Sequence, residues 1–208
     1  MTRSIPVLRL AAAGLLAISL SGCISVLPKT KPSQLYRFGV SSAEASKTPV
    51  APARAEAIGV FRAGGQFQRE SAGDRLLTIT GERASYIAQT RWVAPAEVLF
   101  DAAVATAFEA APNVRLVTRG EPGRAQMSLR LDMRNFETRY DEAKTPVVLV
   151  RVRAVLVRDR STGAVAEHIF ETRVPAERNR VSAIVEAYNT AIAQVLGEVV
   201  AWTSSSAA

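Results

Sequence analysis

The sequence contains few of the residues on which metal sites and many enzymes depend. Its 208 residues include one cysteine, one histidine and 6% aromatic residues. One cysteine cannot close an intramolecular disulfide, and the same counts exclude zinc sites built from Cys and His and iron–sulfur cages. The motifs GxSxG, GxxxxGK(S/T), HExxH and GxGxxG do not occur. We therefore expect no bound metal, no cofactor and no catalytic residue.

Long hydrophobic runs are also missing, and the run near the N-terminus is short. The uncharged segment 10–20 follows Arg3 and Arg9 and precedes the small residues Ser21 and Gly22. It is too short to cross about 30 Å of hydrocarbon, but it has the size of a signal-peptide core with a cleavage site after it. We predict that the first 22 residues are a signal peptide that is removed, and that the protein is exported.

Cys23 directly follows this predicted signal peptide. The sequence Leu20-Ser21-Gly22-Cys23 matches the lipobox of bacterial lipoproteins, in which the thiol is acylated with chains such as palmitate and the cysteine becomes the new N-terminus. Acyl chains contribute about 0.8 kcal/mol for each buried CH₂ and would hold the protein on a membrane. A plain secretory signal with an incidental cysteine is the alternative. Ile24 is not the aspartate that marks inner-membrane retention in this class, which implies the outer membrane, facing the periplasm.

The net charge of +7 does not point to nucleic acid. Removing Arg3 and Arg9 with the signal leaves 24 basic and 19 acidic residues, a net charge of +5. The arginines are spread along the chain, without a clustered basic stripe or interleaved aromatic residues. Arginines paired with nearby acids on the faces of a sheet explain the composition better.

Three segments are predicted after the cleavage site. Residues 23–33 contain two prolines and two lysines without periodicity, so we expect a tether. Residues 34–203 have the length of one domain, and the chain is 48% hydrophobic, enough for one core. Residues 204–208 are only serine and alanine and are predicted to form a disordered tail.

Hydrophobic periodicity predicts the elements of the domain. Alternating apolar residues predict strands at 127–133 and 148–156, and a hairpin leads from the second of these to a strand at 165–174. Apolar residues three and four positions apart predict a helix from Pro95 to Ala110 and a long C-terminal helix from Val181 to Trp202. Shorter strands are predicted at 34–38, 57–61, 75–80, 86–91 and 114–117.

This order of elements predicts an α+β fold. We expect a mostly antiparallel sheet of five or more strands, with two main helices packed on one face, the C-terminal one long. The opposite face of the sheet should be solvated or covered by a partner, because it carries Arg130, Asp132, Arg134, Arg151 and Arg153.

Three side chains are candidate functional residues. His168 is the only histidine, so a Ser-His-Asp arrangement would have to use it, although a strand histidine without a catalytic task is the simpler interpretation. Trp92 lies between a predicted strand and the first helix, and Trp202 lies at the end of the last helix. Each tryptophan is a candidate anchor for a partner or lipid, or a core residue that caps the space between helix and sheet.

The chain resembles a known family along most of its length. The resemblance rests on the lipobox, on Leu35-Tyr36-Arg37-Phe38, on Arg91-Trp92-Val93-Ala94-Pro95 and on the terminal segment 187–202, which ends in tryptophan. These features are similar to those of the ABC-type transport auxiliary lipoproteins, the PqiC-like proteins.

Membership would imply a non-enzymatic lipoprotein of the outer membrane that works with an MCE-domain protein and an ABC permease and ATPase in moving phospholipid between the two membranes. It would carry over the acylation of Cys23 and no catalytic residue. Homo-oligomerisation would then be plausible, because MCE proteins assemble as rings. An envelope hydrolase that uses His168 and a structural outer-membrane lipoprotein are the alternatives.

Overall fold

Three long antiparallel strands form the centre of the fold. The computed structural model describes residues 32–39, 57–117, 125–141, 145–158 and 164–207. In it, β6 (Met127–Arg139) pairs with β7 (Val147–Arg158), and β7 pairs with β8 (Ala164–Pro175). A strand with one buried face alternates apolar and polar residues, and β6 and β7 turn their apolar residues toward the helices, as the sequence predicts.

The remaining strands extend the other edge of β6. Its N-terminal half pairs in parallel with β2 (Ile58–Ala63), and its C-terminal end pairs in parallel with β3 (Arg75–Thr80). Beyond β2 lies β5 (Val114–Val117), also parallel. Beyond β3 lies the antiparallel β4 (Arg83–Trp92), and the edge is β1 (Gln34–Tyr36), parallel to β4. The sheet therefore has eight strands in the described part of the chain, and β1 and β8 lie at opposite edges.

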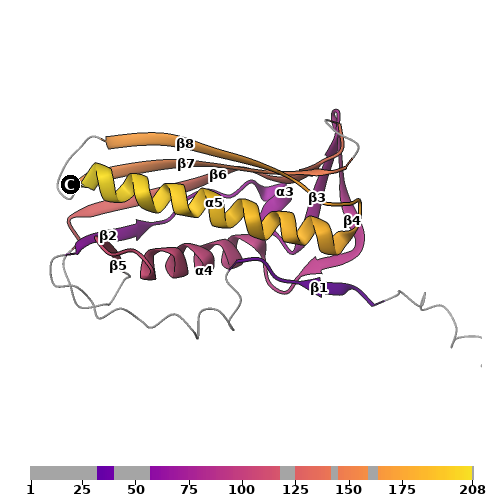
Figure 1. Cartoon of the computed structure of the whole chain (residues 1–208), viewed down its shortest axis with the longest axis horizontal. Helices are drawn as coiled ribbons and strands as arrows, with labels where there is room; N and C mark the ends of the chain where they lie inside the picture. Colours follow the sequence, from indigo (N-terminus) through magenta and orange to yellow (C-terminus); the bar gives the residue numbers. More distant parts are fainter. Residues whose placement is uncertain (1–31, 40–56, 118–124, 142–144, 159–163, 208) are drawn as a thin grey trace, which may run out of the picture. The chain divides into compact units, whose positions relative to one another are not determined.

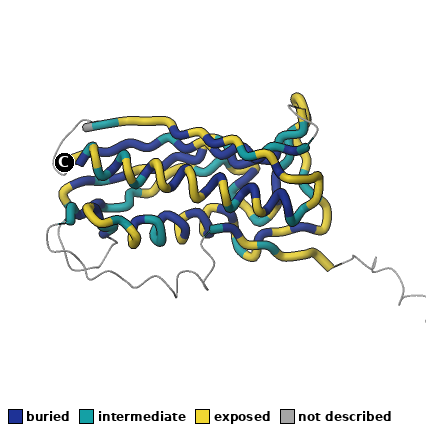
Figure 2. Tube along the Cα trace, in the orientation of Figure 1, coloured by how far each residue is buried: buried dark blue, intermediate teal, exposed yellow. Residues whose placement is uncertain are grey.

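Two helices cover one face of this sheet. The helix α4 (Ala96–Glu109) begins directly after Pro95, and α5 (Val181–Ala207) lies along β7 and β8 and beside α4 (Figure 1). Figure 2 shows buried and exposed residues alternating along both helices, and their buried residues belong to the same core as those of the strands. These observations confirm the predicted α+β class with two main helices on one face. A third, four-residue helix, α3 (Arg69–Ala72), is not predicted from the sequence.

An aromatic cluster joins the helices to the sheet. Tyr188 of α5 is fully buried and its ring lies 4.7 Å from that of Phe136 and 5.3 Å from that of Trp92. Phe38, just after β1, meets the Trp92 ring edge-on at 4.9 Å. Each such pair stabilises the fold by about 0.5–1.5 kcal/mol beyond the area it buries.

The predicted disordered tail is wrong for residues 204–207, which continue α5. Serine and threonine can remain in a helix when their hydroxyls bond to carbonyls of the preceding turn. Here the Thr203 hydroxyl donates to the Val199 carbonyl at 2.7 Å, and the Ser205 hydroxyl donates to the Trp202 carbonyl at 3.0 Å. Ala207 is buried, so the last turn also packs against the domain. Residue 208 lies outside the described residues.

The buried hydroxyl of Tyr188 should make the stability of the fold depend on pH at high pH. Burial raises the pKa of its hydroxyl well above the usual value near 10, and Thr138 donates a hydrogen bond of 3.2 Å to it. Between the ordinary pKa and the raised one, the unfolded state binds fewer protons, so the contribution of Tyr188 to stability falls as the pH rises above about 10.

Tyr188→Phe should therefore cost about 1 kcal/mol at pH 7 through the lost hydrogen bond, and this deficit should shrink above pH 10. Urea unfolding of both proteins at pH 8, 10 and 11 measures the difference. If the two proteins lose the same amount of stability between pH 8 and pH 11, the raised pKa of Tyr188 is contradicted.

Candidate functional site

The predicted acylation site lies just before the described domain. Cys23 and the predicted signal peptide lie outside the described residues, as does the tether up to residue 31. Only eight residues separate Cys23 from Pro32, the first described residue, so their Cα atoms are at most about 30 Å apart even in a fully extended chain.

The two tryptophans lie in different environments. Trp92 is 2% exposed and belongs to the aromatic core, where its indole N–H has no hydrogen-bond partner among the described residues. Trp202 is half-buried near the end of α5, and its ring lies 5.9 Å from that of Phe170. The structure thus places Trp92 in the core and leaves part of Trp202 at the surface.

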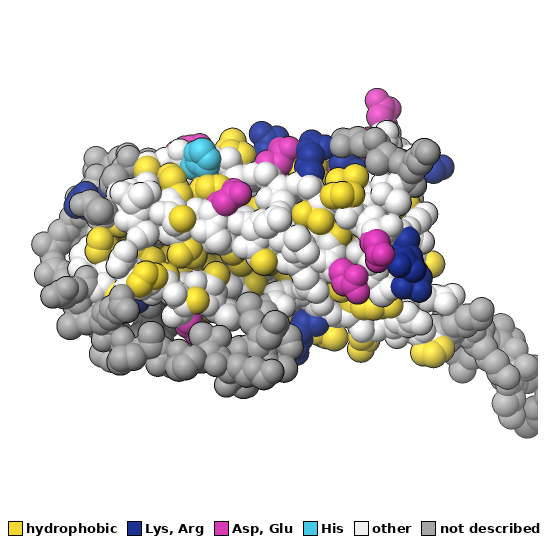
Figure 3. All heavy atoms as spheres, in the orientation of Figure 1, with side chains coloured by type: hydrophobic (Ala, Val, Ile, Leu, Met, Phe, Trp, Pro, Cys, Tyr) yellow, Lys and Arg dark blue, Asp and Glu magenta, His cyan; other side chains and the backbone are white. Residues whose placement is uncertain are grey.

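His168 lies on the edge strand β8, on the face that α5 covers. Its ring lies 4.5 Å from that of Phe170 and 6.4 Å from that of Trp202. It is nevertheless exposed, and Figure 3 shows it at the surface. The contacts that the structure describes for this ring are aromatic.

An apolar groove runs between α4 and α5. Its volume is about 600 Å³, within the range of small-molecule sites. At one end the Gly39 N–H donates to the Asn189 side-chain oxygen at 3.1 Å. Figure 3 shows apolar side chains along the space between the two helices. Most of the side chains that line the groove are small, which leaves space between the two helices. They are Ala103, Ala107, Ala110, Ala111, Pro112, Ile192, Ala193, Leu196, Gly197 and Val200.

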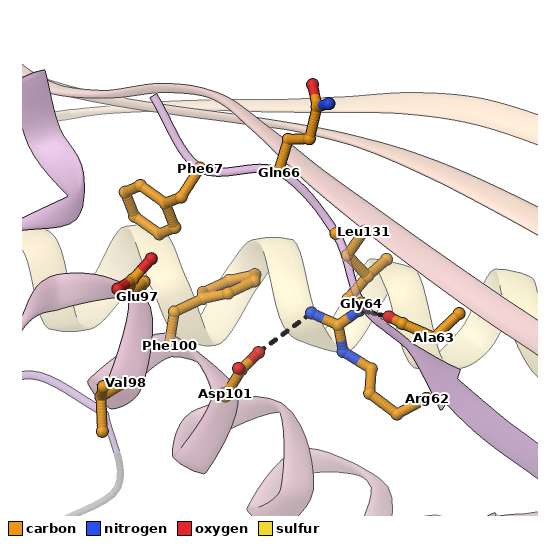
Figure 4. Close-up of a pocket in the computed structure, with 11 residues that line it drawn as sticks. Arg62, Ala63, Gly64, Gln66, Phe67, Glu97, Val98, Phe100, Asp101 and Leu131 are labelled. Atoms are coloured by element: carbon orange, nitrogen blue, oxygen red, sulfur yellow. Dashed lines mark hydrogen bonds and ion pairs between the residues drawn. The ribbon is translucent and has the colours of Figure 1, made fainter. Parts of the chain in front are cut away.

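A second hollow, of about 330 Å³, lies between the segment that follows β2 and the first turns of α4 (Figure 4). Arg62 extends into it and forms an ion pair of 3.0 Å with Asp101. Phe67 and Phe100 line it with their rings 6.1 Å apart. The hollow combines the cation of Arg62, the exposed carboxylates of Glu97 and Asp101 and aromatic walls, without a set of groups that would define a reaction.

The backbone at Gly65 lies very close to the backbone of the central strand β6. A Cβ atom added there would lie 1.7 Å from the carbonyl oxygen of Leu131. The absence of a side chain lets the chain continue beside β6, where the Gln66 N–H donates to Asp132 and the Met133 N–H donates to the Gln66 carbonyl. This close approach fixes the wall of the hollow.

The outer face of the sheet carries a network of ion pairs. Asp132 is 3% exposed, although we predicted it on a solvated face, because the Gln66 backbone and the guanidinium groups around it cover its carboxylate. Arg130 and Arg153 each approach it to 3.3 Å. Arg153 also hydrogen-bonds to Glu167 and holds the pKa of that carboxyl below its usual value. The arginines are therefore paired, as the dispersed charge pattern suggests.

Comparison with known proteins identifies the family. The family model for the ABC-type transport auxiliary lipoprotein component matches residues 74–200, from the turn before β3 to the C-terminal half of α5. The chain belongs to this family. The match covers α4, α5 as far as residue 200 and all described strands except β1 and β2, so the family assignment rests on the domain itself and is independent of the lipobox.

Solved structures show the same fold. Protein XCC0632 from Xanthomonas campestris is 21% identical and has a TM-score of 0.71, over 84% of this chain and 97% of its own. The hypothetical protein CT253 from Chlamydia trachomatis is 9% identical with a TM-score of 0.51, over 71% and 96%. A search of curated proteins found no match. These likenesses establish the fold of this chain.

The helices were also compared with the requirements for crossing a bilayer. Within the described ranges 32–39, 57–117, 125–141, 145–158 and 164–207, no helix has both the length and the apolar character that a membrane span needs.

Sequence reasoning did not find the groove or the role of Gly65. The groove had a signal in Ala103 and Ala107, which lie four residues apart on one side of α4, and in Ala111, which follows the end of that helix. The role of Gly65 depends on a parallel pairing between segments that are far apart in the sequence, and no local pattern reports it. The described structure does not bring Trp92 and Trp202 together into one site, and Cys23 lies outside the described residues.

Proposed function

We propose that this protein is a lipid-anchored accessory subunit of an MCE-type ABC transport system. It docks on the MCE-domain partner and assists the transfer of phospholipid between the inner and outer membranes, facing the periplasm from the outer membrane. The observation that carries this proposal is the family match over residues 74–200. The lipobox at Cys23 supports the anchor, and Ile24 supports the outer-membrane address.

The geometry supports an accessory role in lipid handling. The groove between α4 and α5 is open to the surface and lined with hydrocarbon side chains, which is the chemistry that an acyl chain requires. The outer sheet face offers half-exposed arginines to a partner, among them Arg130 and Arg134. Apolar and charged surfaces therefore lie on different faces of the sheet, one suited to lipid chains and one to a protein or headgroup surface.

The proposal is tested by complementing a strain that lacks the protein. The strain should have a leaky outer membrane with phospholipid in its outer leaflet, and the wild-type chain should restore the barrier. Uptake of a dye that the intact outer membrane excludes measures the barrier. Normal barrier function and normal lipid asymmetry without the protein would contradict the proposal.

His168→Ala distinguishes this proposal from the hydrolase alternative in the same strain. The ring is exposed on an edge strand, so its removal should leave the fold intact, and the variant should complement as well as the wild type. A variant that is present at the normal level but fails to complement would favour an envelope hydrolase that uses His168.

A further inference from the structure

Large hydrophobic side chains are exposed at four positions in the described part of the chain. They are Leu35, 62% exposed, Val98, 53% exposed, and Val93 and Ile169, each 45% exposed. Three of the four come from β1, from the residue after β4 and from the first turn of α4. Single exposed apolar residues are common on soluble proteins, but grouped ones indicate a surface that contacts something apolar.

Strand register places Leu35 and Val93 on the same face. Leu35 is the direct partner of Arg91 in the parallel pair of β1 and β4, and paired residues point to the same side of a sheet. Val93 follows Arg91 by two residues and so points to that side as well, and its N–H donates to the Tyr36 carbonyl at 2.8 Å. The two exposed side chains are therefore diagonal neighbours at the edge of the sheet, on the face opposite to Trp92.

The chain then passes directly from Val93 to Val98. Only Ala94 and Pro95 separate Val93 from the first residue of α4, and the Val98 N–H donates to the Pro95 carbonyl at 3.0 Å. Val98 belongs to α4, on the helix-covered side of the sheet, and its exposed side chain points away from the core, beside the hollow that Figure 4 shows. We call Leu35, Val93 and Val98 the anchor-proximal rim.

The predicted lipid anchor is close to this rim in the sequence. Eleven residues separate Cys23 from Leu35, and the described chain enters β1 from Pro32. The tether carries Lys29 and Lys31, whose charges are attracted to the anionic lipids of a bilayer surface. Ile169 is on β8, at the opposite edge of the sheet, with β4, β3, β6 and β7 between it and β1. Five strand spacings amount to about 24 Å.

We propose that the anchor-proximal rim contacts the lipid bilayer that holds the acylated Cys23. The anchor keeps the domain within a short tether of the bilayer, so Leu35, Val93 and Val98 insert among the headgroups at a small entropic cost. This contact gives the domain a fixed orientation, with the β1 edge on the membrane and β8 directed away from it. The inference rests on the lipid anchor of the proposed function.

The test uses the acylated full chain on vesicles of phosphatidylethanolamine and phosphatidylglycerol. Acylation consumes the thiol of Cys23, so one introduced cysteine carries a fluorophore without competition. The variants are Leu35→Cys, Val93→Cys and Val98→Cys. Ile169→Cys is the control and is matched to Val93 by its exposed fraction. Lipids with a nitroxide on the headgroup quench only fluorophores that lie at the bilayer surface.

Quenching at the three rim positions should lower the emission about twofold or more and should leave position 169 unchanged. Equal quenching at all four positions, or no quenching at the rim of vesicle-bound protein, would overturn the inference while leaving the anchor in place. A full chain that is not acylated and does not bind the vesicles would overturn both the anchor and the inference. Mass measurement of the protein separates these results.

Discussion

Gly65→Ala is expected to destabilise the fold by about 3–5 kcal/mol, an exceptional cost for the addition of one methyl group. The new Cβ would lie 1.7 Å from the Leu131 carbonyl oxygen, which is backbone of the central strand β6 and cannot rotate away. Relief requires the chain around Gly65 to move from β6. That movement breaks the hydrogen bonds from the Gln66 N–H to Asp132 and from the Met133 N–H to the Gln66 carbonyl.

The neighbouring glycine provides a matched control. A Cβ at Gly64 meets nothing within 4 Å, and neither glycine requires a left-handed backbone. Gly64→Ala should therefore change the stability by less than about 0.5 kcal/mol. Thermal unfolding of the purified proteins measures both, and a cost of this size lowers the Tm of Gly65→Ala by roughly 10 °C or more. Equal Tm values for the two variants would show that the close approach to β6 does not exist.

Cys23→Ser is expected to release the protein from the membrane. Serine offers no thiol for acylation, so the acyl chains would be absent. Because each buried CH₂ contributes about 0.8 kcal/mol, loss of the acyl chains should reduce the membrane-bound fraction about 100-fold or more. Separation of the envelope from the soluble periplasmic fraction measures this fraction.

The domain of the Cys23→Ser variant should remain folded, since the described unit begins ten residues after the substitution, at Ser33. Its Tm should equal that of the wild-type domain. A Cys23→Ser protein that still fractionates with the outer membrane would contradict the acylation of Cys23. A folded variant in the soluble fraction would show that the domain folds without the anchor.

Much of the fold could be predicted because its central strands alternate so regularly. Leu129 and Leu131 of β6 are buried as expected, and Val150 and Val152 of β7 face the same helices. The C-terminal helix also follows its pattern, with Tyr188 at the centre of the buried face. The apolar residues of one strand or helix pack against the same neighbouring layer, so the pattern within that element is sufficient to predict its buried face.

The parallel pairings could not be predicted in the same way. Whether β2 and β3 lie beside β6 depends on contacts between segments more than 50 residues apart, such as Val60 with Met127. The close approach at Gly65 and the burial of Asp132 both follow from that arrangement. The end of α5 was missed for a local reason, since serine is usually a poor helix residue and becomes acceptable when its hydroxyl bonds to the preceding turn.

The candidate site also contains one residue that a local sequence motif predicts and others that only the fold reveals. The lipobox is a continuous motif, so Cys23 could be identified from the sequence alone. The anchor-proximal rim and the groove between α4 and α5 are assembled from separate elements, and only the folded chain brings their residues together. Trp92 and Trp202 have similar positions at the ends of predicted elements, but the fold buries one and leaves the other half-exposed.

The most direct test of the proposed function is the recovery of its partner from the envelope. The acylated full chain, gently cross-linked in cells and purified from solubilised membranes, should co-purify an MCE-domain protein together with its ABC permease and ATPase. The folded Cys23→Ser protein, at equal abundance, should recover much less of them because it is no longer held at the membrane. If the acylated wild-type chain recovers no MCE-domain protein, the protein is not the accessory subunit proposed here.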